Sequence, residues 1–93
     1  MKALSRELAP DGIRVNAILI GLIESGQWIR MAATSGTGLQ DFYDRFTANA
    51  GIPLGRFGRA GEFADLASFL LSSRSSYLTG TAINLDGGLS PSV

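Results

Sequence analysis

The most constraining feature of this 93-residue chain is the stretch IRVNAILI at residues 13–20, which is followed directly by Gly21. Its first half alternates apolar and polar side chains, whereas its second half is apolar throughout. Successive side chains of a β-strand point to opposite faces, so the second half must be covered on both sides. Strands that are buried on both faces are typical of parallel sheets with helices around them. The stretch therefore predicts an α/β fold with a parallel sheet.

Other segments complete a β-α-β arrangement within one small domain, which is all that this length allows. Residues 1–9 look like the end of a helix, because a proline and an Asp-Gly turn follow them. Apolar side chains at helical spacing predict a helix over 60–73. Residues 81–86 form a second short strand, which two glycines end. A strand, a helical crossover and a second strand make a β-α-β unit.

Residues 26–50 form an excursion between the first strand and the helix at 60–73. Apolar side chains at helical spacing predict a helix from about Leu39 to Ala50. Two interpretations of the excursion stay open. In the first, it packs its aromatic side chains inward. In the second, it is a lid over a ligand, with Gly36 and Gly38 as the hinge.

Composition excludes several classes of function. Eight basic and eight acidic residues leave no formal net charge, which argues against nucleic acid or an anionic membrane as a partner. The chain has no cysteine and no histidine, so a disulfide, a histidine-assisted triad and an imidazole metal site are excluded. No apolar run is long enough to span a bilayer, and no signal peptide is recognisable. We expect a cytoplasmic protein without a metal site.

The glycine-rich loop at 51–61 is a weak candidate for an anion site. It precedes a helix, and helix N-termini attract anions. However, it matches no phosphate-binding motif, and Glu62 stands where a phosphate needs free N–H groups. Arg56 and Arg59 are able to bind an anion, but arginines beside a turn more often pair with local carboxylates.

The other polar candidates are weaker still. Ser5 and Ser25 have no base to activate them as nucleophiles. Asp41 and Asp44 are three residues apart on one helical face, which favours a solvated surface over acid–base work. The remaining acid–base candidates, Tyr43 and Tyr77, fit packing better. No catalytic residue is predicted from these groups.

The exit of the first strand is a better candidate for a binding site. In open parallel sheets, ligands bind beyond the carboxyl ends of the strands. At that place the sequence runs from Ile20 through Gly21 to Ser25. The glycine permits a close backbone approach, and exposed amides and a hydroxyl follow it.

Six pieces of the chain, taken in order, resemble the C-terminal part of a short-chain dehydrogenase/reductase. The resemblance covers nearly the whole chain except residues 27–50, where that family varies. It implies part of a Rossmann-type, doubly wound parallel sheet that binds NAD or NADP and transfers hydride at an alcohol or ketone carbon. The pieces are ELAPDGIRVNAI at 7–18, Gly21 with Ile23 and Ser25, PLGRFGRAGE at 53–62, FADLASFLLS at 63–72, SYLTG at 76–80 and INLDGG at 83–88.

The resemblance also implies roles for the residues after the first strand. Gly21 would let the backbone approach the cofactor, the main chain of Ile23 would bond its carboxamide, and the Ser25 hydroxyl would replace a threonine. Ile20 stands where the family usually has proline, which removes a rigid φ and restores an N–H. The excursion at 26–50 would be the substrate loop. Its apolar substrate would meet Trp28, Met31, Phe42 and Phe46.

The family's catalytic serine, its Tyr-x-x-x-Lys pair and its pyrophosphate loop are absent from these residues. The chain therefore resembles a fragment that begins at an internal methionine and is inactive alone, whereas its full-length parent acts on a small alcohol or ketone.

The resemblance implies a homo-oligomer, dimer or tetramer, formed through 62–72 and 81–88. Two alternatives stay open, a non-catalytic oligomerisation module and a small anion-binding module. An exposed strand edge and apolar faces predict that the isolated chain is poorly soluble or molten.

Overall fold

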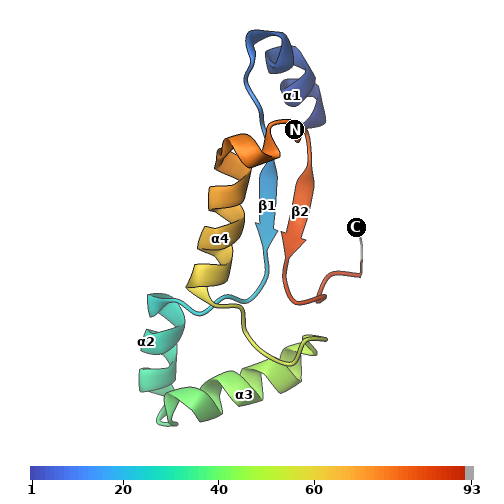
Figure 1. The fold of residues 1–93 in the computed structure, drawn as a ribbon. Helices are drawn as coiled ribbons and strands as arrows, with labels where there is room; N and C mark the ends of the chain where they lie inside the picture. The colour runs from blue at the N-terminus through green and yellow to red at the C-terminus, as the bar shows by residue number, and fades with distance from the viewer. Residues whose placement is uncertain (92–93) are drawn as a thin grey trace.

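A computed structural model describes residues 1–91 and shows a small parallel sheet with helices at its side and at both ends (Figure 1). The fold class is α/β, as expected. The elements are α1 (Lys2–Leu8), the 3-10 turn η1 (Ala9–Asp11), β1 (Ala17–Ile20), α2 (Gly26–Ser35), α3 (Leu39–Ala50), α4 (Ala60–Leu71), the 3-10 turn η2 (Ser73–Ser75) and β2 (Ala82–Leu85).

The sheet pairs β1 with β2 in parallel, with Ala17 opposite Ala82 and Ile20 opposite Leu85. β1 is shorter than the predicted strand at 13–20 and begins at Ala17. The strand begins late because the backbone before Ala17 is hydrogen-bonded to a side chain instead of to a neighbouring strand. The Val15 N–H donates to Thr79 Oγ1 at 3.0 Å, which takes the place of a ladder bond. α4 lies along one side of the sheet (Figure 1).

Arg14 fixes the end of α4 against the start of β1. Its Nη1 donates to the carbonyls of Leu70 and Ser75 at 3.1 and 2.9 Å. Its Nη2 donates to the carbonyl of Ser72 at 3.1 Å. These bonds satisfy carbonyls that the end of a helix leaves without partners. α4 ends at Leu71 rather than at residue 73, because the Ser72 hydroxyl donates to the Phe69 carbonyl and accepts the Arg74 N–H.

α1 buries a small polar residue more deeply than its leucines. Its buried residue is Ser5, which is 1% exposed, whereas Leu4 is exposed. The Ser5 hydroxyl donates to the Lys2 carbonyl at 2.7 Å. Gly80 packs directly over it, since a Cβ atom there would lie 2.6 Å from Ser5 Oγ. The contact between α1 and the turn before β2 thus depends on small residues.

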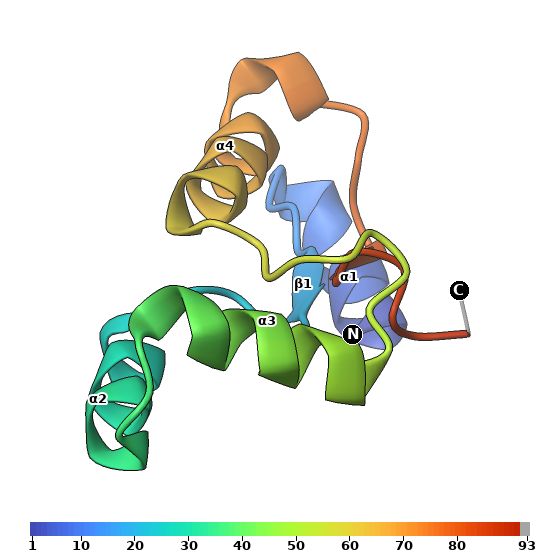
Figure 2. The same cartoon turned by 90° about the horizontal axis from the view of Figure 1, so that it is seen from below.

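α2 and α3 pack together at the end of the molecule away from α1 (Figures 1 and 2), and a hydrophobic core cluster forms around them. Tyr43, Ile52 and Phe57 are its buried members. Trp28 packs edge-on against Phe57, with ring centroids 5.3 Å apart. Phe42 and Phe46 also pack against the cluster, so the first interpretation of residues 26–50, with inward aromatic side chains, is confirmed.

The molecule is elongated, and much of its sheet is uncovered. Its Cα radius of gyration is 16.5 Å, whereas a compact domain of this length has about 12 Å. Leu19 and Ile20 in β1 are 53% and 59% exposed. The expectation of exposed apolar faces is therefore confirmed.

Among residues 1–91, no helix is long and apolar enough to cross a membrane, and no group of acidic side chains is arranged to hold a metal.

Candidate functional site

The segment that leaves β1 is held on both sides by main-chain hydrogen bonds. The Gly21 N–H donates to the Leu85 carbonyl at 3.0 Å and extends the ladder between β1 and β2. The segment then pairs in parallel with Gly58 of the glycine-rich loop. The Gly58 N–H donates to the Leu22 carbonyl at 2.9 Å, and the Glu24 N–H donates to the Gly58 carbonyl at 2.8 Å. Residues 20–25, which we call the exit loop, are thus fixed in place before α2 begins.

This pairing determines the direction of the main-chain groups of Ile23. In a parallel pair, a residue bonds its partner through the groups of its two neighbours, and its own N–H and C=O face the opposite edge. The bonds to Gly58 come from Leu22 and Glu24. The N–H and C=O of Ile23 therefore face away from Gly58 and remain available to a ligand.

Gly21 is required by the close approach of Asp86. A Cβ atom at position 21 would lie 2.7 Å from Asp86 Cβ and 3.0 Å from Asp86 Cα. Asp86 is itself fixed, since its carboxylate accepts the N–H groups of Gly88 and Ser90 at 3.0 Å each. The sequence interpretation missed this role of Asp86. The available signal was an aspartate before two glycines, which favours a side-chain-to-backbone turn.

A groove of about 400 Å³ opens beside the exit loop, which is within the usual size of small-molecule sites. The structure brings all four predicted cofactor-binding residues to its wall. Its apolar wall includes Trp28, and Ser25 stands at its polar end, immediately before the first turn of α2. The Ser25 side chain makes no capping bond to α2 and is exposed, so its hydroxyl can bind a ligand. The groove is lined by Ile20, Gly21, Ile23, Ser25, Gln27, Trp28, Ala60 and Phe63.

The predicted substrate residues are not gathered in one place. Trp28 lines the groove. Phe42 and Phe46 lie behind it in the aromatic cluster, where their rings are 6.5 and 4.9 Å from that of Trp28. Met31 is exposed on α2. Phe42 and Phe46 therefore support Trp28 in this structure and are not part of the groove wall.

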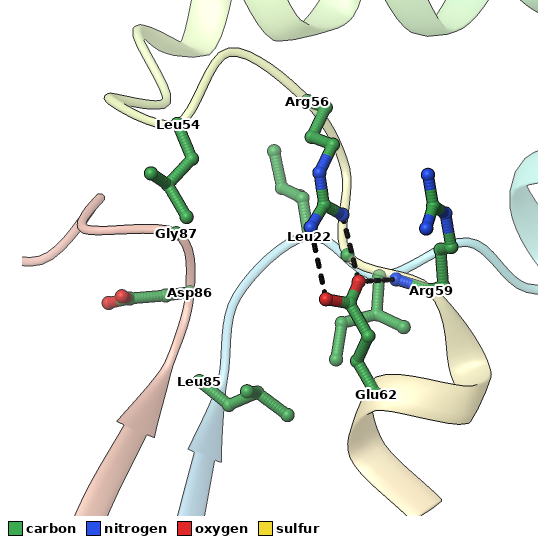
Figure 3. Close-up of a pocket in the computed structure, with 10 residues that line it drawn as sticks. Leu22, Leu54, Arg56, Arg59, Glu62, Leu85, Asp86 and Gly87 are labelled. Carbon is green, nitrogen blue, oxygen red and sulfur yellow. Dashed lines mark hydrogen bonds and ion pairs between the residues drawn. The ribbon is translucent and has the colours of Figure 1, made fainter. Parts of the chain in front are cut away.

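A second cavity, of about 80 Å³, lies between the exit loop, α4 and the end of β2 (Figure 3). Arg56 and Glu62 form an ion pair at its rim, with Nη1–Oε1 and Nη2–Oε2 distances of 2.8 and 3.0 Å. Glu62 Oε1 also accepts the Arg59 N–H at 2.9 Å. The Arg56 hydrogen bond, followed by the Arg59 N–H, lowers the pKa of the Glu62 carboxyl to about 2. Arg56 thus has a local carboxylate partner, as the sequence suggested, and the anion-site alternative gains no support.

The two tyrosines differ sharply in environment. Tyr77 is fully exposed in the turn after η2, so the expectation that it packs is wrong. Tyr43 is only 7% exposed, and its hydroxyl has no hydrogen-bond partner among the described residues. Burial, and then the nearby Glu24 carboxylate, raise the pKa of Tyr43. Asp41 and Asp44 are exposed, as expected for a solvated helical face.

Comparisons with known proteins decide the family. A family model described as enoyl-(acyl carrier protein) reductase matches residues 1–90. The chain belongs to the short-chain dehydrogenase/reductase family. It is 42% identical over 88 residues to a 3-oxoacyl-[acyl-carrier-protein] reductase from Thermotoga maritima, covering 95% of this chain and 32% of that protein. It is 36% identical to an uncharacterized oxidoreductase from Bacillus subtilis, covering 95% of this chain and 33% of that protein.

Solved structures agree with this membership. The NADPH-bound structure of a short-chain oxidoreductase from Pseudomonas aeruginosa PAO1, described as containing an atypical catalytic center, superposes with a TM-score of 0.88 at 42% identity. The alignment covers 99% of this chain and 35% of the Pseudomonas protein. L-sorbose reductase from Gluconobacter frateurii, complexed with NADPH and L-sorbose, superposes with a TM-score of 0.85 at 31% identity. That alignment covers 99% of this chain and 36% of the reductase. The Rossmann-type fold class is confirmed. The chain spans about a third of the length of the relatives it matches.

Proposed function

We propose that this chain forms the nicotinamide-side part of an NAD(P)-dependent oxidoreductase, which transfers hydride between the cofactor and a small alcohol or ketone. The observation that carries the proposal is the groove beyond the carboxyl end of β1, where Ile20, Gly21, Ile23 and Ser25 come together. Open α/β sheets bind their ligands at this place. The solved relatives described as NADPH complexes support the choice of cofactor.

The donor and acceptor groups of the exit loop fit a nicotinamide. A carboxamide offers one acceptor and two donors, and the outward N–H and C=O of Ile23 complement them. The uncapped Ser25 hydroxyl can donate to a phosphate oxygen. When bound, the cofactor supplies or accepts the hydride. The residues of this chain hold and orient it, while Trp28 and Phe63 exclude water from the apolar wall of the groove.

We further propose that these residues do not catalyse alone. The family's acid–base tyrosine is followed four positions later by a lysine, and the one lysine of this chain, Lys2, follows no tyrosine. The acid–base groups would belong to a longer protein, which we call the complete protein.

A small alcohol or ketone with an apolar portion suits the groove wall. A homo-oligomer formed through α4 and β2, and a cytoplasmic location, stay predictions. Light scattering tests the oligomer, and an oligomeric 93-residue chain without cofactor binding would favour the non-catalytic module.

Trp28 allows a direct test of the cofactor groove, because it is the single tryptophan of the chain and lines the groove. We expect NADPH or NADH to quench its fluorescence saturably in the complete protein, and the Trp28→Phe variant to lose that part of the signal. Reduction of a ketone by the complete protein, with no turnover by the 93-residue chain, completes the test. Absence of dinucleotide binding to the complete protein would refute the proposal. Turnover by the 93-residue chain would show that its acid–base groups were misassigned.

A further inference from the structure

Gln27 is a polar residue on the wall of the groove to which the proposed cofactor contacts assign no role. The groove takes its wall from three places, namely the exit loop, the first turn of α2 and the first turn of α4. No charged side chain lines it, and most of its lining residues are apolar. The side-chain amide of Gln27 makes no hydrogen bond to the other described residues, whereas that of Gln40 donates to Asp44 Oδ1 at 2.9 Å. The Gln27 amide is therefore available to a ligand in the groove.

The backbone of Gln27 is held in place by the residues that follow it in α2. Trp28 packs in the aromatic cluster, with its ring 4.9 Å from that of Phe46 and 5.3 Å from that of Phe57. Ala32 lies one turn later on the same helix face and is 2% exposed. Successive residues of a helix point about 100° apart, so Gln27 lies beside this buried face and not on it. A fixed backbone thus presents a side chain that is free to turn toward a ligand.

The chemistry of the groove indicates an uncharged oxygen on that ligand. A primary amide offers one acceptor and two N–H donors. A hydroxyl group both donates and accepts, so it matches the amide in either orientation. Carboxylates and phosphates are typically bound by arginine or lysine, and neither lines the groove.

The oxygen that reacts is not the one that Gln27 would bind. In a ketone reduction, the carbonyl oxygen must receive a proton from an acid–base group. The amide of Gln27 has no proton to give at neutral pH, and the acid–base groups are proposed to lie elsewhere in the complete protein. Gln27 therefore suits a second oxygen of the substrate, which in a small molecule lies close to the reacting carbonyl.

We propose that Gln27 is a substrate-binding residue that selects a small ketone with a hydroxyl group near the carbonyl, and the corresponding diol in the reverse direction. The inference rests on the proposed function and deepens it. The nicotinamide lies on the exit-loop side of the groove, at Ile23 and Ser25. The apolar portion of the substrate lies against Trp28, and its hydroxyl bonds the Gln27 amide. A ketone without the hydroxyl covers the amide and leaves it without a partner, so it is a poorer substrate.

The test measures kcat/KM of the complete protein with NADPH for two matched pairs, acetone with hydroxyacetone and acetophenone with α-hydroxyacetophenone. A hydroxyl group also alters the reactivity of the carbonyl, so the deciding quantity is the change in the ratio within a pair between variants. Gln27→Met keeps the length of the side chain and removes the amide. It should lower the preference for the hydroxylated ketone about tenfold, which corresponds to one hydrogen bond. Gln27→Glu keeps acceptor oxygens and should retain part of the preference.

Two controls separate substrate binding from other effects. Gln40→Met makes the same substitution at an exposed position of α3 and should leave the ratio as in the wild type. Gln27 is also exposed, so its variants should unfold at the wild-type temperature. Titration calorimetry should give Gln27→Met the wild-type Kd for NADPH, because the amide meets the substrate and not the cofactor.

The outcomes distinguish this inference from the function beneath it. An unchanged ratio in Gln27→Met overturns the inference and leaves the proposed function intact. A Kd for NADPH that weakens as much as the ratio falls also overturns it, because Gln27 would then bind the cofactor. A wild type that binds NADPH and reduces neither hydroxylated ketone overturns the substrate class, while the cofactor groove stands. A wild type that binds no NADPH overturns both.

Discussion

The two ends of the molecule differ in how well they bury their own apolar residues. The aromatic end, formed by α2, α3 and the glycine-rich loop, buries Tyr43, Ile52 and Phe57 to 7% exposure or less. The sheet end, formed by α1, β1, β2 and α4, leaves Leu19 and Leu71 53% and 85% exposed. The aromatic end thus has a cluster of large buried side chains, whereas among the described residues of the sheet end Leu70 is the one large apolar side chain that is fully buried.

The groove lies where these two ends meet. Ile20 comes from the sheet end, and Trp28 comes from the aromatic end. The exit loop joins them through hydrogen bonds to Leu85 on one side and to Gly58 on the other. A ligand in the groove therefore contacts a wall supported by a packed core and a wall that needs further cover. Three changes test this difference.

The largest effect is expected from shortening a side chain at the centre of the aromatic end. Phe57 is 3% exposed, and truncation of a buried phenylalanine to alanine costs about 3–5 kcal/mol. Leu19→Ala is the matched change in the sheet end, and its half-exposed side chain should cost well under half of that in the 93-residue chain. Urea unfolding followed by Trp28 fluorescence and by far-UV circular dichroism measures both. Equal losses in the two variants would contradict the comparison.

The exit loop, which joins the two ends, should be sensitive to the addition of one methyl group. Gly21→Ala places a Cβ atom 2.7 Å from Asp86 Cβ, next to backbone that the turn after β2 fixes. The exit loop must shift, at about 1–3 kcal/mol of folding stability, and NADPH should bind the complete protein at least tenfold more weakly. Gly61→Ala is the control, because nothing lies within 4 Å of its Cβ position inside α4. That control should stabilise the protein by about 0.5–1 kcal/mol. Tight NADPH binding by Gly21→Ala would refute the role of the contact.

In the aromatic end, α3 was predictable from sequence. α3 begins and ends where its apolar periodicity and the flanking Gly38 and Gly51 indicate. A helix of this kind depends on residues close in sequence, so the pattern suffices. Periodicity does not say which neighbour covers a face. The place of Phe42 and Phe46 in a substrate loop stays a prediction, and their packing against the aromatic cluster is what the structure adds.

The details of the sheet end were harder to predict, because they depend on contacts between residues far apart in sequence. The short β1 results from the bond that the Thr79 hydroxyl accepts from the backbone before it, and the need for glycine at position 21 comes from Asp86. No local pattern contains such pairings. The location of the candidate site was nevertheless predictable, because parallel sheets place ligands at the carboxyl ends of their strands whatever their side chains. Tyr77, in the turn before β2, shows the remaining failure, since an aromatic residue in a turn has no periodicity to orient it.

The smallest effect concerns the ion pair that links the glycine-rich loop to α4. Because its folded-state pKa is lowered to about 2, Glu62 stabilises the folded protein above its unfolded pKa of about 4.3, and this stabilisation is lost as the pH falls toward 2. We expect the Glu62 carboxyl to stay ionised at pH 3, where an ordinary glutamate is protonated. Carboxyl chemical shifts measured by NMR between pH 2 and 6 test this directly.

Arg56→Met is the matched variant, because it removes the guanidinium and keeps the bond from the Arg59 N–H. In that variant the pKa of Glu62 should rise toward its ordinary value, and the stability between pH 3 and 5 should fall slightly relative to that at pH 7. The change should be small because both side chains are about 40% exposed, and water screens such pairs. A Glu62 pKa that stays near 2 without Arg56 would mean that the main-chain bond at the start of α4 is sufficient. The ion pair would then add nothing to the bond between the Arg59 N–H and the Glu62 carboxylate.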